Sequence, residues 1–213
     1  MLIGVLVVDD HLVVRKGVRA LLTDADDVTV VGEAEDGMEA VTEARRLRPQ
    51  VILMDLKLPC LDGVEATRAI LAEQPDVGVL VLTATEGDEQ VLAAVEAGAL
   101  GYLAKTSKRD DFLLAIRQVA RGELWLPPRL TRKLLAHLKP RSGGSGEALT
   151  SRESGVLSLL AKGRSNHQIA QELNIAEATV RTHVSHILDK LGVSNRVEAA
   201  LQALRAGVAT LEG

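Results

Sequence analysis

The sequence predicts two domains of different class, an α/β domain with a doubly wound, five-stranded parallel sheet and a smaller all-α domain of four helices. Up to about Arg121, short runs of Val, Leu and Ile alternate five times with longer segments whose apolar residues recur at helical spacing. The short runs are apolar almost throughout, as in parallel strands covered on both faces. From Leu149 onward no segment resembles a strand. Five successive β/α units therefore predict the doubly wound sheet, and the helical remainder follows it.

The elements of the first domain are expected in a regular order. Strands are predicted over residues 2–8, 28–32, 51–54, 77–82 and 100–103. Helices are predicted over residues 11–23, 37–47, 63–73, 88–97 and 109–121. In the first of these helices Val14, Val18 and Leu21 recur at helical spacing, which marks the face that packs against the sheet.

The composition changes after the last of these helices. A further helix is expected over residues 130–138, and residues 139–146 read Lys-Pro-Arg-Ser-Gly-Gly-Ser-Gly, the composition of a flexible linker. We therefore divide the chain into three parts. They are a first domain (1–122), a linker helix with a flexible linker (123–146) and a second domain (147–213).

The second domain carries clear signals for the ends of helices. Thr150 with Glu153, and Ser165 with Gln168, match the capping-box pattern, so each pair is expected to open a short helix. Gly192 is expected to end a longer helix. A last helix is predicted over residues 195–206, which completes a compact set of four.

The bulk composition excludes several classes of protein. Of the 213 residues, 46% are hydrophobic, which is enough for a sizeable core. Cys60 is the only cysteine, so an internal disulfide and a zinc site built on paired thiolates are excluded. No apolar run is long enough for a membrane helix, and the start of the sequence lacks a basic leader. We therefore expect a cytoplasmic protein with no membrane partner.

Charge and aromatic content limit how nucleic acid could be bound. The net charge is −4, and the residues from Glu147 onward contain 7 Lys or Arg and 7 Asp or Glu. Phe112, Tyr102 and Trp125 are the only aromatic residues, so base stacking on an aromatic platform is not expected. Any binding to nucleic acid must use a local cluster of basic residues.

Polar side chains follow four of the five predicted strands. They are Asp9 and Asp10, Asp55, Thr83 and Lys105. Ligands of a doubly wound sheet bind at the carboxyl ends of its strands, so these side chains are expected to converge. A single strand-terminal Asp is usually a helix cap, but Mg²⁺ would offset the repulsion between adjacent carboxylates, and hard oxygen ligands suit it. With an inward Lys, this set predicts phosphoryl transfer onto Asp55.

The residues at these strand ends resemble the receiver domain of bacterial two-component response regulators, a flavodoxin-like fold, over residues 2 to about 121. The matching stretches are VLVVDDH (5–11), MDLKLPCLDG (54–63), LTA (82–84) and GYLAK (101–105). The resemblance implies that Asp55 accepts phosphate from a cognate histidine kinase. It implies a Mg²⁺ site at Asp9, Asp10, Asp55 and the Lys57 carbonyl, with Lys105 gripping the phosphoryl group and Thr83 and Tyr102 forming a switch. Cys60 and Leu61 depart from it, since relatives often have Gly and Met there.

In the second domain, a short helix over residues 165–173 and a tight turn precede a helix over residues 176–191 whose outer face is polar. Its apolar stripe is Val180, Val184, Ile187, Leu188 and Leu191, so Thr179, Thr182, Ser185 and His186 project outward. Two short helices joined in this way match a helix-turn-helix, although any helical hairpin produces similar stripes.

The stretch from Leu149 to Ala200 resembles the LuxR-type DNA-binding domain, and with the receiver in front the resemblance is to the NarL/FixJ class of response regulators. Helix 176–191 would then enter the major groove of promoter DNA. Arg181, Thr182 and Ser185 are expected at base edges, and Thr179, His183 and Lys190 at phosphates. One such module discriminates weakly, so we expect a homodimer in the active state, with contacts from Val197, Leu201 and Leu204.

The sequence thus predicts a response regulator in which phosphorylation of Asp55 switches dimerisation and sequence-specific DNA binding, and which is not an enzyme acting on an external substrate. One alternative is a Mg²⁺-dependent phosphatase, but such enzymes carry an Asp-x-Asp pair and this chain has Asp55-Leu56-Lys57. Another is a regulator whose receiver senses a ligand or partner in place of phosphate. Both alternatives remain open to a direct test of phosphorylation.

Overall fold

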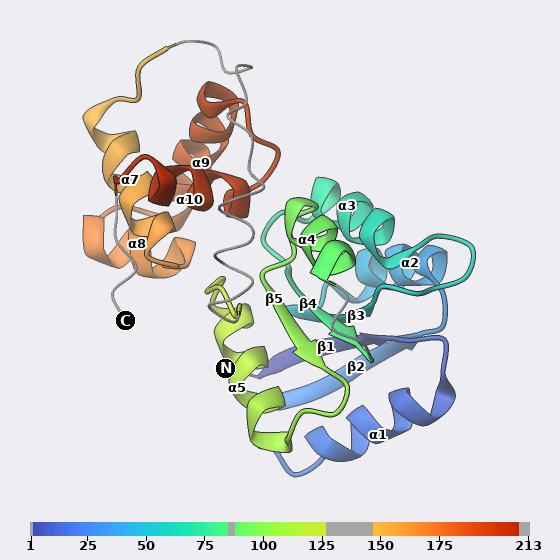
Figure 1. Ribbon diagram of the computed structural model, residues 1–213. Coiled ribbons are helices and arrows are strands. Elements are labelled where there is room, and N and C mark those ends of the chain that lie inside the picture. Colours follow the sequence, from blue (N-terminus) through green and yellow to red (C-terminus); the bar gives the residue numbers. More distant parts are fainter. Residues whose placement is uncertain (1, 85–87, 127–146, 209–213) are drawn as a thin grey trace. The chain divides into compact units, whose positions relative to one another are not determined.

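The computed structural model describes residues 2–84, 88–126 and 147–208 (Figure 1). They form two compact units, of which the first extends to Ala120 and includes Leu124–Leu126, while the second holds the C-terminal helices. The helix predicted over 130–138 and the linker predicted over 139–146 lie outside the described residues. Within the described ranges, no helix is both long enough and apolar enough to cross a bilayer.

The first unit contains a five-stranded parallel sheet with strand order β2-β1-β3-β4-β5. Its strands are β1 (Ile3–Val8), β2 (Val28–Ala34), β3 (Val51–Asp55), β4 (Gly78–Thr83) and β5 (Gly101–Ala104). Every residue of β1 and β3 is buried, as their continuous apolar runs predicted. The doubly wound fold class is confirmed. From β1 the chain goes first to one neighbouring strand, β2, and then to the other, β3. In doubly wound sheets, ligands bind at such a point, next to the carboxyl ends of the strands, which here are the ends of β1 and β3.

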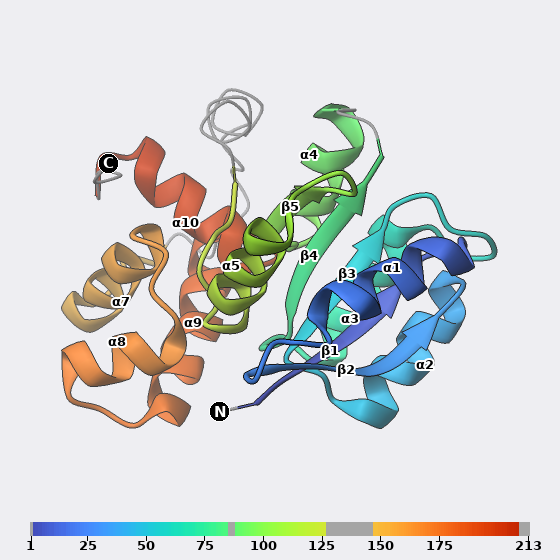
Figure 2. The same cartoon turned by 90° about the horizontal axis from the view of Figure 1, so that it is seen from below.

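Helices cover both faces of this sheet. They are α1 (Leu12–Leu22), α2 (Gly37–Leu47), α3 (Gly63–Glu73), α4 (Asp88–Glu96) and α5 (Arg109–Ala120). α1 and α5 lie side by side on one face, and α2, α3 and α4 lie on the other (Figures 1 and 2). Asp62 begins α3 as its cap, since its carboxylate accepts from the backbone N–H groups of Val64 and Glu65, both at 2.9 Å.

The edge of the sheet at β5 is extended by a short segment that the sequence analysis assigned to the linker. The backbone N–H of Trp125 donates to Leu100 O at 2.9 Å, and the N–H of Tyr102 donates to Trp125 O at 3.1 Å. The first unit therefore reaches beyond the predicted end at residue 122. An edge strand exposes unpaired N–H and C=O groups, and this pairing covers them.

The second unit consists, in its described part, of α7 (Ser151–Ala161), α8 (Asn166–Leu173), α9 (Glu177–Leu191) and α10 (Arg196–Arg205). Both predicted capping boxes form, at Thr150 and at Ser165. A single hydrophobic cluster joins the four helices, and Val156, Ile169, Val180, Ile187 and Ala199 are fully buried in it. α8 and α9 meet at a three-residue turn that begins at Asn174, whose φ is 51°.

Candidate functional site

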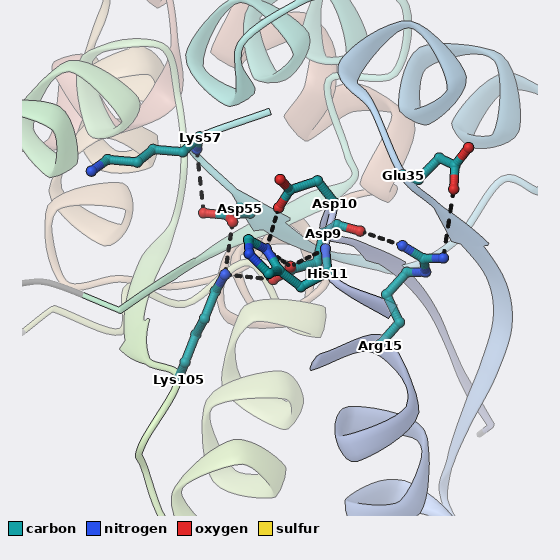
Figure 3. A network of polar contacts seen from close by, with 8 residues as sticks. All are labelled: Asp9, Asp10, His11, Arg15, Glu35, Asp55, Lys57 and Lys105. Atoms are coloured by element: carbon teal, nitrogen blue, oxygen red, sulfur yellow. Dashed lines mark hydrogen bonds and ion pairs between the residues drawn. The ribbon is translucent and has the colours of Figure 1, made fainter. Parts of the chain in front are cut away.

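The carboxyl edge of the sheet brings together side chains from three strands. Val8 pairs with Met54 in the register of β1 and β3, so the next residues, Asp9 and Asp55, lie side by side. Lys105, which follows β5, places its Nζ 2.6 Å from Asp9 Oδ2 and 2.7 Å from Asp55 Oδ2 (Figure 3). The convergence predicted from the strand ends is therefore present for these three side chains.

The charges at this edge stabilise one another. Burial alone lowers the pKa of Lys105, but its contacts with Asp55 and Asp9 outweigh burial and hold that pKa above the usual 10.5. Lys105 is thus a cation at physiological pH. It stands between two buried carboxylates that would otherwise repel each other.

Hydrogen bonds from the backbone hold both carboxylates in place. The N–H of His11 donates to Asp9 Oδ1 at 3.0 Å, and the N–H of Lys57 donates to Asp55 Oδ1 at 3.3 Å. The Lys57 side chain itself points away from the site (Figure 3). A Cβ on Gly63 would lie 2.0 Å from Asp55 O, so the start of α3 can approach the loop after Asp55 only because this residue is glycine.

The loop beyond Asp55 contains one residue other than glycine in a left-handed backbone conformation. Cys60 has φ 64°, in the left-handed region that glycine adopts at little cost. A glycine would fit that conformation, whereas the Cβ of Cys60 is strained. The thiol is exposed and free.

The acidic pair provides ligands that fit a hard divalent cation. Ligand atoms of Asp9, Asp10 and His11 lie within 4.8 Å of one another. Asp9 is fully buried and, apart from its ion pair with Lys105, its Oδ2 has no hydrogen-bond partner, which leaves lone pairs for a cation. Carboxylate oxygens are the ligands that Mg²⁺ prefers. The residues therefore fit the ion at Asp9 and Asp10.

Two further contacts lie around the predicted metal site. Lys105 forms ion pairs with both Asp9 and Asp55 and so links them. His11, which the sequence analysis did not include in the site, places Nδ1 2.5 Å from Asp10 Oδ1. Its position directly after the acidic pair was the available signal.

Thr83 and Tyr102, the predicted switch, lie on neighbouring strands. Val81 pairs with Tyr102 and Thr83 with Ala104 in the register of β4 and β5. Side chains two residues apart along a strand share a face, so Thr83 and Tyr102 project from the same face of the sheet. Both side chains are half-buried.

The second candidate surface is the outer face of α9. Val180 and Ile187 are buried, whereas Thr179, Arg181, Thr182 and Ser185 are exposed, and His183 is half-buried. Arg181 Nη2 lies 3.2 Å from Glu177 Oε1, one turn earlier. The outward face therefore has the residues that the sequence analysis placed on it.

Lys190, which the sequence analysis expected to contact phosphate, makes a contact within its own unit. Its Nζ lies 2.9 Å from Glu153 Oε2, and its side chain is only 17% exposed. The hydrogen bond from Lys190 is the main reason why the pKa of Glu153 falls to about 2, with further help from the Thr150 backbone. Lys190 thus connects α9 to α7. No local pattern indicates this contact, since its partner lies 37 positions away.

The predicted dimer residues lie on α10. Leu204 is partly buried and packs against the hydrophobic cluster of its own unit. A dimer contact through Val197, Leu201 and Leu204 stays a prediction.

Comparison with known proteins identifies both units. Residues 5–117 match the family model for the response regulator receiver domain, and residues 147–203 match that for bacterial regulatory proteins of the luxR family. A receiver domain followed by a LuxR-type helix-turn-helix domain defines a class of two-component response regulators. The chain belongs to the response regulators with a LuxR-type DNA-binding domain.

Similar proteins span nearly the whole chain. The transcriptional regulatory protein LiaR of Bacillus subtilis is 45% identical over 96% of this chain and 98% of its own length. The response regulator protein VraR of Staphylococcus aureus is 42% identical over 96% and 98%. Among solved structures, the response regulator ChrA of a haem-sensing two-component system is 41% identical, with a TM-score of 0.53 over 97% of this chain and 98% of that chain. A structure of RcsB dimers bound to DNA is 27% identical, with a TM-score of 0.56 over 99% and 100%.

Proposed function

We propose that Asp55 is the phosphoacceptor of this regulator and that its phosphorylation by a histidine kinase promotes dimerisation and binding to promoter DNA. The observation that carries the proposal is the contact of Lys105 Nζ with Asp55 Oδ2 at 2.7 Å, next to the acidic pair. The carboxylate that would be modified therefore already has a cation at hydrogen-bond distance.

The proposed reaction moves one phosphoryl group. A carboxylate oxygen of Asp55 forms a bond to phosphorus while the bond from phosphorus to the donor's histidine nitrogen breaks, and that nitrogen keeps the electron pair. Lys105 stabilises negative charge on the phosphoryl oxygens. Mg²⁺, held by Asp9 and Asp10 with Asp55 and the Lys57 carbonyl, would neutralise further charge on these oxygens. No external substrate is turned over, so we do not regard the protein as an enzyme.

Incubation with Mg²⁺ and acetyl phosphate, followed by intact mass measurement, tests this proposal. We expect one phosphoryl group on the wild-type chain and none on Asp55→Asn. Asp62→Asn is the matched control, because it removes an acidic group from the same loop while an asparagine still caps α3. Loss of the adduct in this control but not in Asp55→Asn would contradict the assignment. Continuous release of phosphate would instead support the phosphatase alternative, and absence of any adduct would support a receiver that senses something else.

For the second unit we propose that α9 reads base edges through Arg181, Thr182 and Ser185, while Thr179, His183 and Lys190 contact phosphates. The structure of RcsB dimers on DNA supports both a DNA partner and a dimeric assembly by similarity. Because the proposed partner is chromosomal DNA, we also propose that the protein acts in the cytoplasm. Arg181→Lys should lose about 1–3 kcal/mol of discrimination for guanine, measured on promoter fragments with substituted bases. Arg164→Lys, which alters a cation paired with Glu172 in the same unit, should leave discrimination unchanged.

A further inference from the structure

A buried arginine lies behind the acidic pair and is not used in the proposed reaction. Arg15, in α1, is 9% exposed and its Nη1 donates to the backbone carbonyl of Asp9 at 2.7 Å. Burying a guanidinium is costly unless its charge and its N–H groups are satisfied. The contacts that satisfy the guanidinium of Arg15 therefore indicate the role of this residue.

The hydrogen bond to Asp9 is the shortest of these contacts. Arg15 Nε lies 3.4 Å from Glu33 Oε2, and Arg15 Nη2 lies 3.7 Å from Glu35 Oε2. Glu33 is held more closely by Arg19, at 2.7 Å. The two glutamates thus offset the charge of Arg15, while its directed hydrogen bond goes to the main chain of the acidic pair.

Arg15 completes the set of bonds that hold Asp9. The backbone N–H of Asp9 donates to Ala34 O at 3.1 Å, and Asp9 Oδ1 accepts from the N–H of His11 at 3.0 Å. Arg15 fixes the carbonyl, from the opposite side of Asp9 to Lys105 (Figure 3). Only Oδ2 is left to Lys105 or to a cation. Asp10, by contrast, has a side chain that is 37% exposed.

We propose that Arg15 is a positioning residue for the divalent cation, acting on the backbone between Asp9 and Asp10 without touching the ion. The proposal rests on the function proposed above. Two effects of opposite sign are possible, because a nearby positive charge repels a cation, whereas a fixed backbone favours its binding. The proximity of Glu33 and Glu35 offsets the charge of Arg15, so the positional effect dominates.

The test compares Arg15→Met, Arg15→Lys and Arg19→Met in the full-length chain. Arg19→Met is the matched control, because it removes the same charge from the same helix, and the same partner Glu33, without any contact to Asp9. The dissociation constant for MgCl₂ is measured by isothermal titration calorimetry. The rate of phosphorylation by acetyl phosphate is measured as a function of Mg²⁺ concentration, and thermal unfolding without Mg²⁺ confirms that each variant folds.

For Arg15→Met we expect Mg²⁺ affinity to fall by about tenfold or more, the usual effect of removing a residue that orients a metal ligand. The phosphorylation rate should need correspondingly more Mg²⁺ but return to within about twofold of wild type at saturation. Arg15→Lys should recover part of the loss, and Arg19→Met should match wild type. A merely structural role would lower the saturated rate as well.

Unchanged or tighter Mg²⁺ binding in Arg15→Met would overturn the inference, as would an equal loss in Arg19→Met. Failure of the proposed function looks different. In that case the wild-type chain itself takes up no phosphoryl group, whatever residue stands at position 15.

Discussion

Replacing Ala176 by serine should stabilise the helix that we propose reads DNA. Ala176 occupies the N-cap of α9 and makes no side-chain cap hydrogen bond. Its backbone, with φ −69° and ψ 146°, closely matches that of Ser165, the cap of α8, with φ −70° and ψ 163°. The N–H of Thr179 already donates to Ala176 O at 3.0 Å, so a serine hydroxyl at position 176 would accept from the N–H of Ala178 without rearrangement of the main chain.

The expected gain is about 1 kcal/mol, the usual difference between serine and alanine at an N-cap. Thr179 stands where a capping box has Glu or Gln, so the reciprocal half of that motif is absent and a larger gain is not expected. For a domain of this size, about 1 kcal/mol raises the melting temperature by roughly 4–8 °C. Differential scanning calorimetry of the full-length chain measures this shift in the transition of the helical unit.

The control is Ala176→Val, which supplies no hydroxyl and is as poor an N-cap residue as alanine, so it should give no gain. Amide exchange of Ala178 reports the new hydrogen bond directly and should slow in the serine variant alone. An unchanged melting temperature, or equal gains from serine and valine, would show that the added hydroxyl does not cap α9 and that the reasoning is wrong.

Three further predictions concern the stability of the two units. Cys60→Gly should stabilise the chain by about 1 kcal/mol in urea unfolding because it relieves the left-handed backbone at φ 64°, whereas Cys60→Ala, which keeps the Cβ, should not. Gly63→Ala should cost about 1–3 kcal/mol and slow phosphorylation, since its Cβ would lie 2.0 Å from Asp55 O, while Gly17→Ala, with open space around it in α1, should gain up to about 1 kcal/mol. Because the pKa of Glu153 is depressed to about 2, its contribution is complete above the unfolded value near 4.5 and is lost as pH falls towards 2. The urea midpoint of wild type should therefore fall more steeply than that of Glu153→Gln between pH 4.5 and pH 3, and parallel curves would contradict the role of this ion pair.

The sheet and its charged edge could be predicted because both depend on local pattern. Continuous apolar runs identify buried strands, and the parallel topology then brings the strand ends together without knowledge of side-chain contacts. The end of β2 was harder to predict. The expected strand stopped at Gly32, but β2 continues through Glu33 to Ala34 because the ladder with β1 persists there, with Val7 opposite Glu33. A glycine followed by a charged residue resembles the end of a strand, and tertiary pairing overrides that local signal.

Contacts between distant residues could not be predicted from the same patterns. The ion pair of Lys190 with Glu153 and the hydrogen bond from Arg15 to Asp9 depend on how helices pack against their neighbours. Lys190 and Arg15 are each a charged residue in an amphipathic helix, where a solvated position is the ordinary expectation. The pairing of Trp125 with the edge of β5 was missed for a related reason, since a segment of three residues has no periodicity of its own.

The charge of the helical unit gives an independent reason to expect a dimer on DNA. Residues 147–213 contain as many acidic as basic residues, and several of their cations already have carboxylate partners. The pairs are Arg164 with Glu172 at 3.0 Å, Arg181 with Glu177 at 3.2 Å and Lys190 with Glu153 at 2.9 Å. Affinity for duplex DNA depends mainly on the number of phosphates that a protein neutralises, so one such unit contributes a weak electrostatic term. A second copy on a symmetric site doubles that number and also doubles the bases that are read. Control by dimerisation would then change the number of phosphates neutralised and of bases read, and these numbers limit the affinity of a single copy for DNA.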